Sequence, residues 1–153
     1  FRSISSPVLA GDLILCPYAR GASLTAVRLG DDVPEEKRIA WKREDLGADV
    51  PTPTVVDNRA YILADDGKVT CIDVATGKDV WSDSLPRNRA KYYSSPVYAD
   101  GKLYLSREDG AIFVVAAGDK FELLASNQVP GETVATPVLV NSKILIRTFD
   151  GLY

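Results

Sequence analysis

A serine or threonine followed by proline occurs four times along the chain at nearly even spacing. The prolines are Pro7, Pro53, Pro96 and Pro137, which lie 46, 43 and 41 residues apart. A period of this length points to a repeat architecture, in which each repeat buries its apolar face against its neighbours. The 153 residues therefore hold three full repeats and part of a fourth.

Each repeat reads as a set of short β-strands. The stretch 52–81 contains three apolar runs that are rich in β-branched and aromatic residues and are separated by turn residues. Runs of this kind are too short for helices and are typical of an antiparallel meander. An Asp-Gly pair follows the second run, and its glycine would supply the positive φ that a tight hairpin turn needs. These pairs are Asp66-Gly67, Asp109-Gly110 and Asp150-Gly151, and the first repeat has Gly21 instead.

The second run of each repeat sets the alignment of the four copies. We align the segment 58–62 with 11–15, 101–105 and 142–146. In this register Cys16 matches Leu63 and Cys71 matches Val114, so both cysteines are expected to be small buried side chains. A disulfide between them would require strands of neighbouring repeats to meet, and the sequence leaves that open.

An all-β fold follows from these repeats. A four-stranded sheet cannot bury both of its faces alone, and stacking such sheets around an axis gives a β-propeller. We expect about three and a half blades of four antiparallel strands each. The expected bounds are about 6–49, 52–93 and 95–134 for the full blades and 136–153 for the partial one.

Two segments depart from the repeat, and the ring is incomplete. Residues 30–38 lengthen the last hairpin of the first blade and read as a polar surface loop. In the third repeat Leu124 stands where the second has a tryptophan, so its outer contact is expected to be weaker. An unclosed propeller exposes sheet edges and apolar faces. We therefore expect either a piece of a larger protein or blades supplied by another chain, with a self-paired dimer as the bolder alternative.

Composition excludes several functional classes. The chain has no histidine, so the commonest metal ligand and general base is absent. Its net charge is −3, which disfavours a nucleic-acid surface, because such surfaces cluster Lys and Arg. No run approaches the roughly 20 apolar residues of a membrane-spanning helix.

A motif at the end of the second repeat carries a family resemblance. The pattern Asp-x-x-Thr-Gly-Lys-x-x-Trp, which begins at Asp73 and includes Thr76 and Gly77, resembles the tryptophan-docking motif of the quinoprotein-like β-propeller family. In that family the tryptophan packs between neighbouring blades, and the Thr-Gly turn aims it. The resemblance implies this structural role for Trp81 and for Trp41 of the first repeat.

The same family includes pyrroloquinoline-quinone dehydrogenases as well as relatives without a cofactor. The resemblance implies a quinone and calcium for the dehydrogenases, but the vicinal cysteine pair that caps their quinone is missing here, since Cys16 and Cys71 lie in separate repeats. The recurring carboxylates precede turn glycines and read as turn residues. They are Asp65, Asp66, Glu108, Asp109 and Asp150. We therefore expect no cofactor, no metal site and no catalytic residue.

A basic cluster is the one candidate binding surface. Arg87, Arg89 and Lys91, with Tyr92, lie in the segment that leads into the third repeat, and Arg107 is expected nearby. They are expected to form a solvated loop or, alternatively, a partner- or anion-binding patch.

Three functional interpretations follow from the resemblance. The favoured one is a non-catalytic binding or scaffold module with protein partners, periplasmic or secreted as family members mostly are. The alternative is the C-terminal part of a pyrroloquinoline-quinone-dependent dehydrogenase whose active site lies mostly on other blades. A domain attached to an enzyme or an extracellular sensor is the third.

Overall fold

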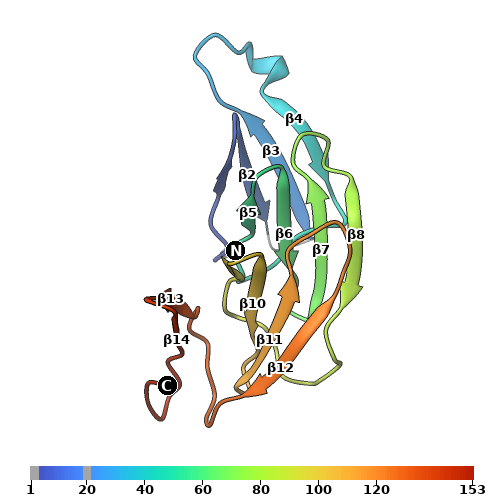
Figure 1. The fold of residues 1–153 in the computed structure, drawn as a ribbon. Helices are drawn as coiled ribbons and strands as arrows, with labels where there is room; N and C mark the ends of the chain where they lie inside the picture. Colours follow the sequence, from blue (N-terminus) through green and yellow to red (C-terminus); the bar gives the residue numbers. More distant parts are fainter. Residues whose placement is uncertain (1–3, 19–21) are drawn as a thin grey trace.

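The computed structural model describes residues 4–18 and 22–153. Within them, consecutive strands form three four-stranded antiparallel sheets and a small two-stranded one (Figure 1). The first sheet holds β1 (Val8–Ala10), β2 (Leu13–Tyr18), β3 (Ser23–Arg28) and β4 (Ile39–Arg43). The second holds β5 (Thr54–Val56), β6 (Arg59–Leu63), β7 (Lys68–Asp73) and β8 (Asp79–Ser84). The third holds β9 (Val97–Ala99), β10 (Lys102–Ser106), β11 (Ala111–Ala116) and β12 (Leu123–Gln128), and the fourth holds β13 (Val138–Val140) and β14 (Lys143–Leu145).

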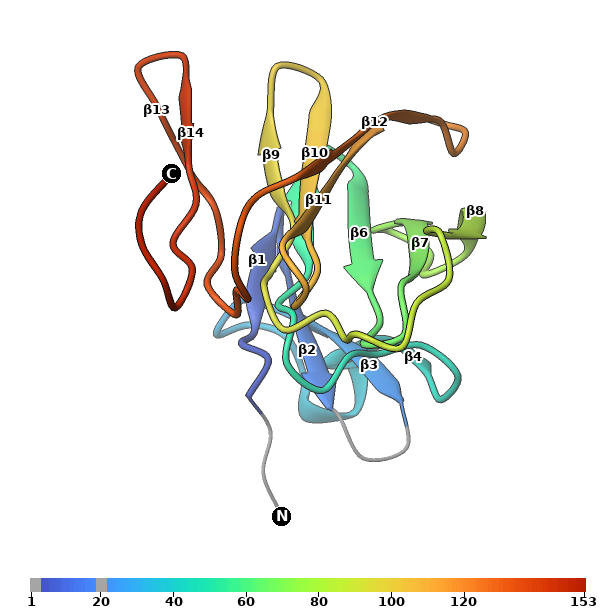
Figure 2. The same cartoon turned by 90° about the horizontal axis from the view of Figure 1, so that it is seen from below.

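The sheets are arranged like blades of a propeller. The first strands β1, β5, β9 and β13 contact one another in turn. The last strands β4, β8 and β12 lie farther out (Figure 2). The all-β prediction is confirmed, and the three full sheets with a small fourth one form a partial β-propeller.

Two hydrophobic cores lie between neighbouring sheets. The first inter-sheet core joins Leu15, Leu24 and Ala26 of the first sheet to Ala60 and Ile72 of the second. The second inter-sheet core joins the other face of the second sheet to the third. Its members include Tyr61, Leu63, Val69, Cys71, Leu103, Leu105, Phe113 and Val115. Burial of both faces of the second sheet is what a propeller blade requires.

The strand register corrects the alignment of the first repeat. A two-residue turn separates Ala10 from its partner Leu13, and the equivalent turn in the second sheet separates Val56 from Arg59. Leu13 therefore matches Arg59, one position away from the expected alignment. A slip of one residue moves every side chain to the opposite face of its strand.

This one-residue shift determines which way Cys16 of the first repeat faces. Leu15 faces the second sheet. Its neighbour Cys16 therefore points to the opposite face of the first sheet and is partly exposed there. Cys71 faces the third sheet and is fully buried, and burial raises the pKa of its thiol to about 11. Both thiols are free. The expectation of burial is thus confirmed for Cys71 and wrong for Cys16, and the disulfide does not form.

The hairpin turns differ from the expected type. At the second sheet, Ala64 N donates to Lys68 O and Gly67 N donates to Ala64 O, so the loop has three residues and only its glycine has positive φ, +92°. In the third sheet, a tight two-residue turn with two positive φ angles joins β9 to β10, where Asp100 has +49° and Gly101 has +68°.

The polar segment of the first sheet forms a loop that contains a short 3-10 turn. This turn, Glu35–Lys37, is exposed, and Arg28 ties it to β3 by donating from Nη1 to Lys37 O at 2.7 Å.

No helix in the described ranges is long and apolar enough to cross a membrane.

Candidate docking sites and a basic loop

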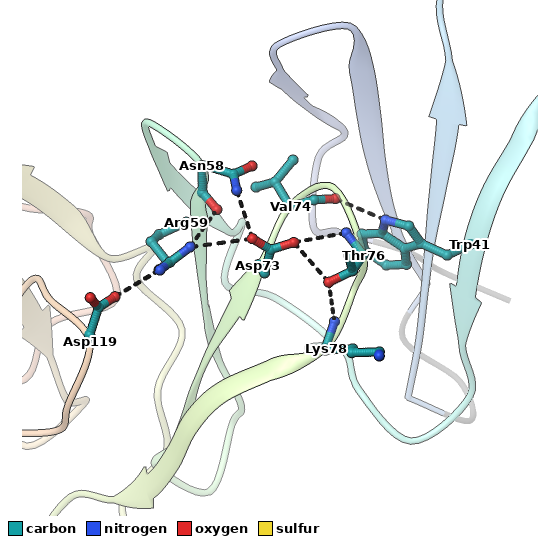
Figure 3. A network of polar contacts seen from close by, with 8 residues as sticks. All are labelled: Trp41, Asn58, Arg59, Asp73, Val74, Thr76, Lys78 and Asp119. Atoms are coloured by element: carbon teal, nitrogen blue, oxygen red, sulfur yellow. Dashed lines mark hydrogen bonds and ion pairs between the residues drawn. The ribbon is translucent and has the colours of Figure 1, made fainter.

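Trp41 on β4 docks against the second sheet (Figure 3). Its Nε1 donates to Val74 O at 2.9 Å. The indole lies against Gly77, where an added Cβ would come within 2.6 Å of Trp41 Cδ2. Gly77 also has φ of +69°, a conformation that side chains disfavour. Two independent requirements therefore demand glycine at this position.

The turn that receives Trp41 is built by a carboxylate. Asp73 Oδ1 accepts from Thr76 N at 2.9 Å and from Thr76 Oγ1 at 2.7 Å. Asn58 Nδ2 donates to the other oxygen at 2.6 Å. The Thr76 hydroxyl is the main reason that the pKa of Asp73 is lowered. This side-chain-to-backbone bonding is how Asp shapes a turn.

Arg59 extends the same network to the third sheet. Its Nη1 lies 3.4 Å from Asp73 Oδ2, and its Nε and Nη2 donate to Asp119 Oδ1 at 3.0 and 2.9 Å (Figure 3). Asp119 is largely exposed, so this bridge adds little stability but links two sheets.

Trp81 on β8 makes the equivalent contact one sheet further along. Its Nε1 donates to Gly118 O at 2.7 Å. Its ring lies 5.6 Å from that of Phe121 in an edge-to-face arrangement and 6.0 Å from that of Tyr61. Each tryptophan thus reaches forward to the next sheet. The turn that contains Gly77 receives Trp41 of the preceding sheet, whereas the sequence had associated this turn with Trp81.

At the tryptophan position the third sheet has Ala125 instead of the expected Leu124. Trp81 pairs with Cys71, and the matching pair in the third sheet is Ala125 with Val114. Leu124 lies at the bulge of β12 and is 45% exposed. The Ala125 side chain is too short to reach the fourth sheet, so β12 has no counterpart of the Trp41 and Trp81 contacts within the described residues.

A basic loop, residues 85–93, follows β8 and leads toward β9. It is fixed to the third sheet, because Asn88 Nδ2 donates to Asp109 Oδ2 at 3.2 Å and Lys91 N donates to Glu108 Oε2 at 3.3 Å. Arg87 and Arg89 are exposed, and neither has an ion pair within the described part of the chain. The loop therefore presents two unpaired cations on a fixed backbone.

Two of the five candidate binding residues have buried side chains: Arg107, which follows β10, and Tyr92, which belongs to the loop itself. The Arg107 side chain is 9% exposed and forms a two-point ion pair with Asp109 at 2.8 and 3.0 Å. Its Nη1 donates to Pro86 O at 3.0 Å. Tyr92 is 2% exposed, and burial raises its pKa to about 12. The structure brings Arg87, Arg89 and Lys91 to the surface, while Arg107 supports the loop from below and Tyr92 is the buried residue of the loop.

The described residues do not fit a quinone–calcium site. No group of three His, Cys, Asp or Glu side chains within these ranges could hold a metal. The recurring carboxylates are used locally, since Asp65 Oδ1 accepts Asp49 N at 3.2 Å and Asp66 Oδ1 accepts Lys68 N at 3.1 Å. The two cysteines face opposite directions on neighbouring sheets, so they offer no vicinal pair.

A relay of hydroxyl groups joins the inner strands, and sequence reasoning missed it. Ser6 N donates to Thr52 Oγ1 at 3.0 Å, and Thr52 N donates to Ser95 Oγ at 3.0 Å. Ser95 N then donates to Thr136 Oγ1 at 3.1 Å. The recurring Ser/Thr-Pro pair was the available signal: its hydroxyl accepts one hydrogen bond from the preceding sheet.

A family model matches residues 21–123, and its family is described as outer membrane protein assembly factor BamB. Curated relatives with that name are 23% identical over 99 residues in Marinobacter adhaerens and 31% over 111 residues in Moranella endobia. The Escherichia coli relative is 28% identical over 148 residues, which is 96% of this chain and 35% of the relative. The chain spans between about a quarter and a third of the length of these curated relatives.

Solved structures share the fold at low sequence identity. A europium-containing methanol dehydrogenase superposes with a TM-score of 0.69 at 13% identity, over 85% of this chain and 25% of the enzyme. The computationally designed protein Ika4 gives 0.75 at 15% identity, over 99% of this chain and 90% of Ika4. BamB from Moraxella catarrhalis gives 0.51 at 16% identity, over 99% of this chain and 58% of that one. At these identities the likeness concerns the fold alone.

Proposed function

Because the chain belongs to the family of outer membrane protein assembly factor BamB, we propose that it is a non-catalytic β-propeller module that binds other proteins and serves in outer membrane protein assembly. It acts outside the cytoplasm, in the periplasm. It forms one arc of a larger propeller, whose remaining blades belong to the same protein or to another chain. No cofactor is assigned to it.

The observation that carries this proposal is the basic loop. A binding surface works best when its cations are held in place before the partner arrives, because less side-chain and loop freedom is then lost on binding. Asn88 and the backbone of Lys91 fix the loop to the third sheet, and Arg107 supports it from below. Arg87 and Arg89 remain unpaired and exposed, which suits an acidic protein surface.

The two tryptophans supply the rigidity of the scaffold. We propose that the contacts of Trp41 and Trp81 are the tryptophan-docking contacts of the family, with Asp73, Thr76 and Gly77 forming the receiving turn. Residues of this kind hold the sheets in fixed relation, so that loops from different sheets present one constant surface to a partner.

The test is binding to purified soluble domains of the outer membrane protein assembly machinery of the source organism, measured by isothermal titration. The variant R87E/R89E should bind at least tenfold more weakly and with a smaller dependence on salt, because two cations leave the interface. Its thermal unfolding should be unchanged, since both side chains are exposed and neither makes a hydrogen bond or an ion pair within the described residues.

Lys143→Glu together with Lys37→Glu is the matched control, because both lysines are exposed cations outside the basic loop and neither has an ion pair within the described residues. This variant carries the same change of charge and should bind as the wild type does. Equal weakening of both variants would show an effect of net charge alone and would contradict the proposal.

The competing function is that of a pyrroloquinoline-quinone-dependent dehydrogenase segment, which shares the fold. Quinone and calcium added to the protein with an alcohol and a redox dye separate the two functions. Dye reduction that requires residues of this chain would replace the scaffold proposal.

A further inference from the structure

The fourth strand of each full sheet is an open edge. The strands β4, β8 and β12 each pair with one strand, and within the described residues no strand lies beyond them (Figure 2). The second sheet has a neighbouring sheet on both faces, and its strand β8 is still unpaired on the outer side. Further sheets in the arc would therefore leave these edges open. Every second residue of such a strand points its backbone N–H and C=O outward, where they can pair with another chain.

Charge distinguishes β12 from the other two edges. In β8 the charged residues are Asp79 and Asp83, and the strand pairings place Leu123 and Asn127 at the same positions of β12. In β4 the position of Asn127 is occupied by Arg43. The strand β12 itself has no charged residue. Charged side chains are a common protection of an edge strand against pairing with other chains, and β12 lacks this protection.

The side chains of β12 also suit a partner strand. Leu123 is 38% and Leu124 is 45% exposed at the start of the strand, and the exposed residues at its end, Ser126, Asn127 and Gln128, are uncharged. An added strand would thus find apolar contact at one end and backbone hydrogen bonds along its whole length. Main-chain hydrogen bonds supply the affinity at such an edge, and side-chain contacts add selectivity.

The end of β12 lies beside the basic loop. Gln128 Nε2 donates to Asp109 O at 2.6 Å, and Asn88 Nδ2 donates to Asp109 Oδ2 at 3.2 Å. The last residue of β12 and the middle of the basic loop are therefore held by the same residue. Arg87 and Arg89, which flank Asn88, are exposed and have no ion pair within the described residues. A strand that lies along β12 would reach these two cations at one end of its path.

We propose that β12 and the basic loop form one docking site for an extended polypeptide segment, which adds a fifth strand to the third sheet. The segment lies antiparallel to β12, which is the slightly more stable pairing. Because β12 runs toward the basic loop, an antiparallel segment begins there, and its acidic residues are at its N-terminal end, against Arg87 and Arg89. This inference rests on the proposed binding function and specifies the partner as an extended chain.

The probe is a synthetic peptide with the order Asp-Glu-Thr-Val-Thr-Val-Thr-Val, and fluorescence anisotropy of a labelled copy measures its binding to the wild-type protein. Two further peptides carry N-methyl groups, one on the threonines and the other on the valines. Only one of these two sets of amides faces β12. One methylated peptide should therefore bind about tenfold more weakly than the probe, and the other should bind equally well. No binding at millimolar peptide, or equal binding of the two methylated peptides, overturns the proposal.

The reversed peptide, Val-Thr-Val-Thr-Val-Thr-Glu-Asp, tests the direction of the added strand. It has the composition of the probe but carries its acidic residues at the C-terminal end, so an antiparallel arrangement places them away from the basic loop. It should bind about tenfold more weakly than the probe, because the charge pairs are lost. A reversed peptide that binds as tightly as the probe overturns the antiparallel site.

Exchange of Asp-Glu for Asn-Gln in the probe tests the contact with the basic loop. This amide peptide should bind the wild type more weakly than the probe does. The variant R87E/R89E should weaken binding of the acidic probe and leave binding of the amide peptide unchanged, because only the acidic end meets the two cations. Equal weakening of both peptides in R87E/R89E contradicts the proposed position of the acidic end.

The double variant Leu123→Asp/Asn127→Asp copies the charges of β8 onto β12. It should bind the probe about tenfold more weakly, because a charged edge resists pairing. Its circular dichroism should match that of the wild type, since both side chains are exposed. Val140→Asp/Asn141→Asp is the matched control, because it changes an exposed valine and an exposed asparagine outside β12 and the basic loop, and it should bind as the wild type does. Equal weakening of both variants would show an effect of net charge and overturn the edge-strand site.

The result is separable from the test of the proposed function. Binding to folded domains of the assembly machinery that weakens in R87E/R89E supports the scaffold role by itself. If the two methylated peptides then bind equally, the scaffold role stands and the docking of an extended segment on β12 is overturned.

Discussion

Gly77 illustrates how a single residue joins two sheets. We expect Gly77→Ala to lower the free energy of unfolding by about 3 kcal/mol, because the new Cβ meets the Trp41 indole at 2.6 Å and the residue has positive φ. Gly101→Ala is the matched control. Gly101 has φ of +68°, and a Cβ added there would meet no neighbouring atom within 4 Å, so only the backbone cost of about 1 kcal/mol remains. Urea unfolding measures both, and equal losses would contradict the docking contact.

Asp109 should make the stability of the protein depend on pH. The Arg107 guanidinium lowers the pKa of Asp109 in the folded state, so the pair stabilises the fold above the unfolded-state pKa of about 3.9. This contribution is lost as the pH falls through the folded-state pKa. The difference in free energy of unfolding between the wild type and Asp109→Asn should therefore be constant near neutral pH and should shrink below about pH 4. A constant difference down to pH 2 would contradict this account.

A local motif in the sequence indicates candidate structural residues, but it does not indicate which side chains are buried by contacts between repeats. One motif predicted a structural role for Gly77, Asp73 and the two tryptophans. The burial of Arg107 could not be inferred, because it depends on Phe113, whose ring lies 5.1 Å from the guanidinium, and on the loop at Pro86. Such contacts join repeats, and a local pattern does not contain them.

At the scale of the strand, the Ser/Thr hydroxyl relay explains why the recurring pair begins each sheet. Ser95→Ala removes the acceptor of Thr52 N–H and should cost about 1 kcal/mol, the usual value for a partly buried hydrogen bond. Ser126→Ala, on the exposed strand β12, is the control and should be neutral. Chemical unfolding of the two variants checks this, and equal stability would remove the relay as a stabilising feature.

Strand existence was predictable and register was less so. Repeated apolar runs and turns predicted nearly every strand, because these signals are local. The first repeat was misaligned by one residue, since Gly11 begins its turn where Asp57 begins the turn of the second sheet. Hydrogen-bond pairing between strands decides such a slip, and in this case it decided which way Cys16 points.

At the scale of the whole molecule, the second sheet contributes one face to each inter-sheet core, so the arc should unfold cooperatively. The chain has two tryptophans, and each reports one sheet-to-sheet contact. Fluorescence of Trp81 in Trp41→Phe and of Trp41 in Trp81→Phe should each give a single urea transition, and both transitions should coincide with the loss of circular dichroism in the same variant. Each substitution should cost about 1 to 2 kcal/mol. A transition of either indole that precedes the loss of circular dichroism would show that the sheets separate before they unfold.

The central claim is that each tryptophan docks forward on the next sheet and so fixes the arc. Nuclear Overhauser contacts of the two indole N–H protons test it most directly. The structure predicts contacts from Trp41 Hε1 to the turn at Val74 and Gly77 and from Trp81 Hε1 to Gly118, with both protons protected from exchange. Contacts between Trp81 Hε1 and Gly77, or rapid exchange of both indole protons, would contradict the account.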